Sequence, residues 1–127
     1  MSSTLTVTNL TATNLTDGAG TTSTFANVTN GSAKAWVVGT TSAGITDSVN
    51  VSSGVDNGIG NYSYSYTNNM ANSTWCFSGS SEVLARTCTL DVSNVSKDSN
   101  SFDVRIFIHD GNEDDRSHGG MIQGDLA

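Results

Sequence analysis

The segment Asn61-Tyr62-Ser63-Tyr64-Ser65-Tyr66 places a tyrosine at every second position. Because successive side chains of a strand point to opposite faces, this spacing predicts a half-buried β-strand with its three tyrosines on one face. Such a face can be a core or a subunit interface, or it can recognise a sugar or another protein. The regular alternation favours the core or interface, and Trp36 and Trp75 are assigned in the same way.

Short strands are also predicted on both sides of the tyrosine segment. Asp56-Asn57-Gly58, followed by Gly60, is a turn signal because Asn and Gly tolerate positive φ. We expect this turn to join the tyrosine strand to an alternating strand at 45–51 as a hairpin. The other expected strands lie at 33–38, 74–78, 83–90, 102–108 and 119–126. This pattern predicts an all-β protein, a small antiparallel β-sandwich or barrel.

The first 32 residues have a different composition. Leu5, Leu10 and Leu15 recur every five residues within a Thr/Asn-rich repeat, and this spacing matches neither a helix nor a regular strand. We expect residues 1–32 to form an extended N-terminal arm used for anchoring or oligomerisation, with residues 33–127 as the β-sandwich body. The three leucines are the candidate contacts of the arm, packed against the body or against other copies. An unstructured tail is the alternative.

Composition and charge exclude several classes of protein. The formal net charge is −7 with only 5 Lys and Arg, which disfavours a nucleic-acid binder. No run approaches the roughly 20 apolar residues of a membrane span, and no secretory leader is expected at the N-terminus. Leu, Ile, Val and Phe together number 26 of 127 residues. A core this small leaves an isolated monomer marginal, so a homo-oligomer is expected.

The two cysteines, Cys76 and Cys88, lie in strand-like stretches. A hairpin centred near Glu82 would set them opposite each other and make a disulfide conceivable. Two free thiols are the favoured alternative, because proteins assembled in a reducing cytosol rarely keep disulfides.

Motifs for chemistry are scarce. The segment from Asp110 begins like a calcium loop, but Asp115 and Met121 stand where the loop needs Gly and a bidentate Glu. We therefore expect no metal site, with Asp110, Asn112 and Asp114 as weak candidates only. No nucleophile elbow, phosphate loop or zinc-protease motif occurs in the sequence, so we expect no enzymatic activity and no cofactor.

The acidic segment 109–118 has a second interpretation as a site of partner contact. It lies between the expected strands 102–108 and 119–126, so we expect it to protrude as a tip loop. Loops on a rigid scaffold commonly carry recognition. The acids of this loop are therefore candidate partner-binding residues: Asp110, Glu113, Asp114 and Asp115.

From Ala33-Lys34-Ala35-Trp36-Val37 onward the chain resembles short fibre-like virion proteins of tailed bacteriophages, especially those of marine bacteria. The likeness continues through Asp47–Ser53, Asp56–Tyr62, Met70 with Trp75, and Gly124-Asp125-Leu126-Ala127, and it includes the start Ser3–Leu10. The chain departs from the family at Val38–Gly44, where a longer Asn/Gly-rich turn is usual, and in the acidic segment. The resemblance implies a tail fibre, tail spike or head fibre component, commonly trimeric, with a β-rich tip.

The function expected from these observations is that of a virion structural protein assembled in the host cytoplasm. It would be an oligomeric fibre or spike component that contacts other virion proteins and possesses a surface for a host glycan or protein. A capsid decoration or cement protein that stabilises the head is the alternative, favoured by the short chain. A carbohydrate-binding adhesin module is a further alternative. Neither nucleic acid nor membrane insertion is expected.

Overall fold

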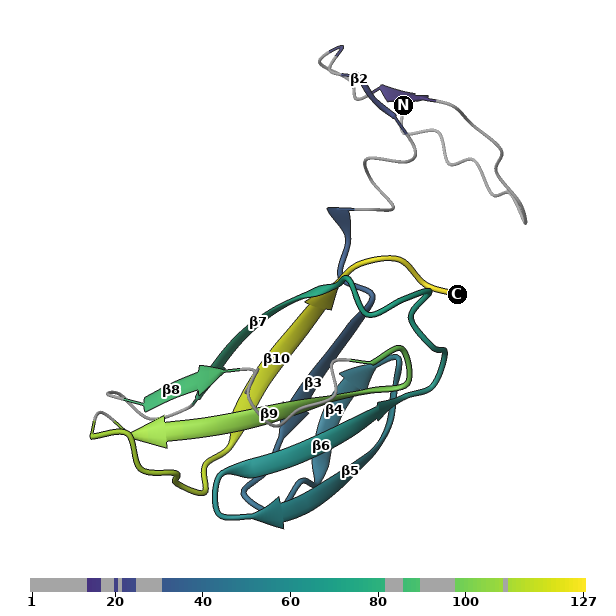
Figure 1. Cartoon of the computed structure of the whole chain (residues 1–127). Helices are drawn as coiled ribbons and strands as arrows, with labels where there is room; N and C mark the ends of the chain where they lie inside the picture. The colour runs from purple at the N-terminus through teal and green to yellow at the C-terminus, as the bar shows by residue number, and fades with distance from the viewer. Residues whose placement is uncertain are drawn as a thin grey trace. The chain divides into compact units, whose positions relative to one another are not determined.

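Figure 1 shows the computed structural model, which describes residues 14–16, 20, 22–24, 31–81, 86–89, 98–108 and 110–127. The chain divides into two units, Met1–Ser32 and Ala33–Ala127. In the first unit, β1 (Asn14–Thr16) pairs with β2 (Thr22–Thr24) in an antiparallel arrangement. Leu15 is part of β1, whereas Leu5 and Leu10 lie outside the described residues.

Two four-stranded antiparallel sheets make up the second unit. One sheet consists of β3 (Ala35–Gly39), β4 (Ile45–Val49), β7 (Cys76–Ser81) and β10 (His118–Gln123). The other consists of β5 (Val51–Gly58), β6 (Asn61–Tyr66), β8 (Arg86–Thr89) and β9 (Ser101–Ile108). The strand orders are β4-β3-β10-β7 in the first, called the β10 sheet, and β5-β6-β9-β8 in the second, called the β6 sheet (Figure 1). The sheets do not close into a barrel, so the predicted all-β fold is confirmed as a sandwich-like arrangement.

The core follows from period-two alternation in both sheets. Tyr62, Tyr64 and Tyr66 are at most 5 % exposed, which confirms the core interpretation of the tyrosine face. They pack with the other buried apolar residues, which are Ala35, Val37, Ala43, Val51, Met70, Trp75, Phe102, Val104, Ile106 and Ile122. Trp75 therefore lies in the core as expected, but Trp36 does not. It alternates with buried Ala35 and Val37 and so projects from the opposite face of β3.

The prediction that the tyrosine strand forms a hairpin with residues 45–51 names the wrong partner strand. The stretch 45–51 breaks at Asn50, which adopts φ 57°, and β4 and β5 then enter different sheets. Two hydrogen bonds between the Asn50 side-chain amide and the backbone of Asn68, at 2.7 and 2.9 Å, hold this corner. The partner of β6 is β5, which runs through the expected turn to Gly58, so the chain reverses between Gly58 and Asn61. Gly58 and Gly60 there take φ of 126° and 63°, which side chains disfavour.

The hairpin that would place the two cysteines opposite each other is not formed either. The partner of Cys76 in the β10 sheet is Gln123, whereas that of Cys88 in the β6 sheet is Ile106. β7 is drawn to β10 because Phe77 then packs against the core, with its ring centroid 6.3 Å from that of Phe102. Cys76 is an exposed free thiol.

Candidate functional site

Four side chains from three segments form a group called here the polar cluster: the buried Tyr62, Tyr64 and His118, and the partly buried Asp115. β6 supplies the tyrosines, β10 begins with His118, and Asp115 lies on the connection between β9 and β10. The Tyr62 hydroxyl donates to Asp115 Oδ1 at 3.0 Å, and the Tyr62 ring stacks on the imidazole with 4.6 Å between centroids. The Tyr64 hydroxyl lies 2.8 Å from His118 Nε2. The cluster thus ties the two sheets together at one end of the sandwich.

The hydrogen bonds of His118 show which ring nitrogen carries the proton when the imidazole is neutral. Nδ1 lies 2.9 Å from the carbonyl oxygen of Arg116, which can only accept, so Nδ1 carries the proton. Nε2 is then the acceptor for the Tyr64 hydroxyl. Burial lowers the pKa of His118 below its ordinary 6.5, although the bond to Arg116 opposes this effect. A neutral imidazole is the form that this environment stabilises.

Asp115 couples the polar cluster to the β5–β6 turn. Its Oδ1 also accepts the Gly60 backbone N–H at 2.7 Å. Burial raises the pKa of the Tyr62 hydroxyl above its ordinary 10.0, and the hydrogen bond to the Asp115 carboxylate raises it further. Both effects keep the phenol protonated and able to donate.

The polar cluster is closed to substrates. His118 is 1 % exposed. Its strand neighbour Gly39 leaves no spare space, because a Cβ there would approach Nε2 to 2.7 Å and overlap the Tyr64 hydroxyl. A nucleophile or general base must reach its substrate within hydrogen-bonding distance. The contacts of the buried imidazole and tyrosine side chains therefore stabilise the fold.

We predict unequal effects from removing the hydroxyls of the tyrosine face. Tyr64→Phe would leave His118 Nε2 buried without its donor, so the free energy of unfolding should fall by about 1–3 kcal/mol. The Tyr66 hydroxyl is buried and has no partner among the described residues, and burial raises its pKa, as does the Asp98 charge. Tyr66→Phe should therefore be neutral or stabilising in urea unfolding. Equal losses in the two variants would contradict this assignment.

The acidic segment is not a loop between paired strands. β9 and β10 belong to different sheets, so the segment crosses from one to the other, and its second half is partly buried. Glu113 forms an ion pair with Arg105, and Asp114 pairs with Arg116 at 3.0 Å. Only residues 110–112 of the described part are exposed. Glu113, Asp114 and Asp115 are thus less exposed than a freely protruding tip loop would leave them, and whether these acids and Asp110 contact a partner stays a prediction.

The weak metal candidates are occupied with other contacts. Asp110 Oδ1 accepts the Asn112 backbone N–H at 3.2 Å, which forms a local turn, and Asp114 is engaged with Arg116. Within the residues that the structure describes, no group of three or more His, Cys, Asp or Glu side chains could hold a metal ion.

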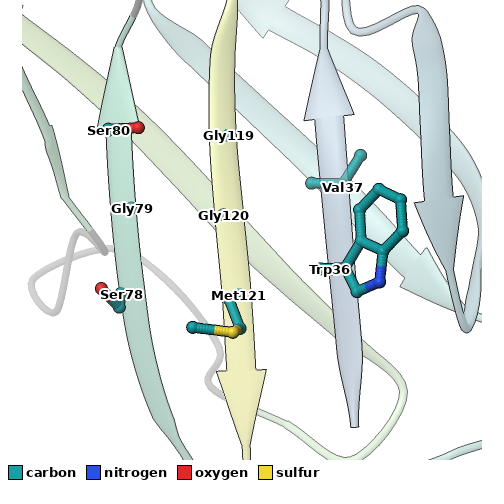
Figure 2. Close-up of a pocket in the computed structure, with 8 residues that line it drawn as sticks. All are labelled: Trp36, Val37, Ser78, Gly79, Ser80, Gly119, Gly120 and Met121. Atoms are coloured by element: carbon teal, nitrogen blue, oxygen red, sulfur yellow. The ribbon is translucent and has the colours of Figure 1, made fainter. Parts of the chain in front are cut away.

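A groove on the outer surface of the β10 sheet is the second candidate site (Figure 2). This outer groove has a volume of about 290 Å³. Its lining consists of backbone, hydroxyl, thioether and indole groups from β3, β7 and β10: Trp36, Val37, Ser78, Gly79, Ser80, Gly119, Gly120 and Met121. On this surface Gly119 of β10 is paired with Ser80 of β7, and these two small residues leave the backbone thinly covered and so create the depression. The mixture of apolar and hydroxyl groups suits a ligand or a protein surface rather than a reaction.

No known protein family, no curated protein and no solved structure matches this chain. Among the described residues, no helix has the length and apolar character needed to cross a membrane. The functional proposal therefore depends on the residues themselves.

Sequence reasoning did not identify the outer groove or the role of Asp115. The groove had a local signal, since Ser78-Gly79-Ser80 and Gly119-Gly120 are runs of small residues, although Gly79 and Ser80 lie beyond the strand expected at 74–78. Small residues on one strand make a groove only where the next strand is also small, and that register is not visible in the sequence. The hydrogen bond from Tyr62 to Asp115 joins residues far apart in the chain and had no local signal.

Proposed function

We propose that this protein is a structural component of a bacteriophage virion, a small trimeric fibre or spike subunit. The observation that carries the proposal is where the body places its buried polar side chains and its exposed apolar ones. The His118 and tyrosine side chains of the polar cluster are buried inside the sandwich, whereas Val38, Val49 and Met121 of the β10 sheet are exposed beside a groove. Apolar surface that remains exposed on a folded body commonly serves assembly. The resemblance of the sequence to short fibre-like virion proteins supports the same function.

The two units have separate roles in this proposal. Residues 1–32 attach the subunit to other virion proteins through Leu5, Leu10 and Leu15, and the sandwich projects from the particle. A host-surface glycan or protein would meet the acidic segment at its exposed end, Asp110–Asn112. In this proposal the protein is located in the virion, which is assembled in the host cytoplasm. Capsid decoration is the competing role, and the position on the particle separates the two.

Electron microscopy of purified particles labelled with an antibody against the body tests this function. Label on the tail or on projecting head fibres is the expected result. Label spread regularly over the capsid would favour a decoration protein. Its absence from particles, with the protein present in infected cells, would overturn the virion proposal.

We predict that Leu10→Asp lowers particle occupancy severalfold, because the proposed attachment requires this leucine to be buried against another virion protein, and burying a charge there would cost several kcal/mol. Circular dichroism of the isolated variant should show the body folded as in the parent, since residues 33–127 form a unit of their own. Occupancy is measured by quantitative blotting of purified particles. A matched control is Thr11→Asp, which places the same charge in the same repeat, at the position next to Leu10. Normal incorporation of Leu10→Asp would refute the anchoring role.

A further inference from the structure

β5 ends with an asparagine followed by a glycine, Asn57-Gly58, just before the chain reverses into β6. An asparagine in front of glycine loses its side-chain amide more readily than one in front of a bulkier residue, because glycine has no Cβ to obstruct its backbone nitrogen. Asn57 is exposed, so water has access to its side chain. The groups around the pair decide whether this reaction proceeds in the folded protein.

Asn57 is the extra residue of a β-bulge. In the ladder between β5 and β6, Asp56 pairs with Tyr62 and Gly58 pairs with Asn61, which leaves Asn57 without a position opposite it. Attack on the amide requires a rotation of the asparagine backbone, and regular ladder pairing on both sides would resist that rotation. Gly58 has φ of 126°, and a Cβ there would meet none of the described atoms within 4 Å. The backbone around the reacting atoms therefore has room to rearrange.

A carboxylate lies at the nitrogen that has to react. The Gly58 backbone N–H donates to Asp56 Oδ1 at 2.9 Å. An amide nitrogen is a poor nucleophile until its proton is removed. A general base must lie within about 2.6–3.2 Å of the group from which it takes the proton, and Asp56 meets this requirement.

A hydroxyl lies at the group that has to leave. Asn57 Nδ2 donates to Ser63 Oγ at 2.6 Å. The leaving nitrogen needs one more proton to depart as ammonia, and in that step the roles reverse, so that the Ser63 hydroxyl donates to it. Pairing with Val55 on one side and Asp103 on the other holds Ser63 in β6. The reacting amide thus lies between a base and a proton donor.

We propose that Asn57 deamidates in the folded protein, with Asp56 as the general base and Ser63 as the proton donor. Asp56 takes the proton of the Gly58 nitrogen, whose electron pair then forms a bond to the side-chain carbonyl carbon of Asn57. The bond from that carbon to Nδ2 breaks, and ammonia leaves with a proton from Ser63, which recovers one from protonated Asp56 through water. Water opens the resulting cyclic imide at either carbonyl, which gives aspartate or isoaspartate. This inference does not depend on the proposed function.

Mass spectrometry of proteolytic peptides from the purified protein tests the proposal. Incubation at neutral pH in water enriched in the heavy oxygen isotope should label the peptide that contains Asn57, because opening of the imide adds an oxygen from water. The folded parent should convert at least as fast as the same chain unfolded in urea. A folded parent that keeps the Asn57 amide, while the chain in urea loses it, would overturn the proposal.

Asp56→Asn separates the base from the turn that it forms, because an amide oxygen still accepts the Gly58 N–H but is not a base. Conversion at Asn57 should slow by at least about tenfold in the folded variant and should equal that of the parent in urea. Asp47→Asn is the matched control: Asp47 Oδ1 also accepts a following backbone N–H, that of Ser48 at 2.9 Å, but in the other sheet. This control should convert like the parent. Equal rates in folded Asp56→Asn and the folded parent would contradict the assigned base.

Ser63→Ala tests the proton donor on the other side of the amide. Conversion at Asn57 should slow severalfold in the folded variant, because the leaving nitrogen loses the hydroxyl beside it. A faster conversion would show that Ser63 only restrains the amide, which overturns its assignment as donor. Asn57→Gln is the blank, since its longer side chain places the amide carbon out of position, and it should gain no label. Thermal melting followed by circular dichroism verifies that the rates compare folded proteins.

Discussion

Phe102→Ala should lower the free energy of unfolding by about 3–5 kcal/mol, the usual cost of truncating a buried aromatic side chain. Phe102 is fully buried in β9 and lies at the centre of the sandwich. Four aromatic rings have their centroids 5.4–6.4 Å from its own: Tyr64, Tyr66, Trp75 and Phe77. Two of these rings come from β6 and one from β7, so the truncation removes contacts to both sheets.

The natural control for this substitution is Phe107→Ala on the same strand. Phe107 occupies an odd position of β9, opposite in face to Phe102, and is only partly buried. Urea unfolding of both variants should give a much smaller loss for Phe107→Ala. Similar losses would show that the core is not centred on Phe102. For a sandwich with so few strong hydrophobes, the expected loss is a large fraction of the total stability.

Stability should fall as the pH is lowered below 6.5, because the pKa of His118 is lower in the folded protein than in the unfolded chain. Above pH 6.5 the imidazole is neutral in both the folded and the unfolded state, so its ionisation does not change the free energy of unfolding. Below pH 6.5 the unfolded chain binds the proton before the folded protein does. The free energy of unfolding therefore falls by an amount that approaches about 1.4 kcal/mol per pH unit. The loss stops growing once the pH has fallen through the folded pKa. Protonation of Nε2 would also break its bond with the Tyr64 hydroxyl.

Thermal unfolding between pH 7.5 and 5.5 measures this effect, since carboxyl groups titrate mainly below that window. His118→Gln cannot ionise, and its amide can still accept from Tyr64. The variant should be less stable than the parent at pH 7.5, because the stacking on Tyr62 is lost, and its melting temperature should depend less on pH. If the melting temperature of His118→Gln depended on pH as strongly as that of the parent, another titrating group would be responsible for the effect.

Local patterns in the sequence predicted the parts of this fold that depend on alternation alone. The tyrosine face of β6 was correctly expected to be a core or interface face, because side chains two residues apart share one side of a strand. The all-β class followed from the same signal. At Asn50 the local pattern failed, since alternation continues through a residue whose positive φ sends β4 and β5 into different sheets.

The sequence by itself determined the all-β class, the approximate place of most strands and the inward face of β6. Only the tertiary structure decided which strands are neighbours, and the candidate sites depend on that choice. Asp115 meets Tyr62 because the connection after β9 crosses to the other sheet, and the outer groove exists because β10 places Gly119 beside Ser80 of β7. Contacts between residues far apart in the chain have to be satisfied together in one packed core. Their selection is therefore a property of the whole fold and is not written in any single stretch of residues.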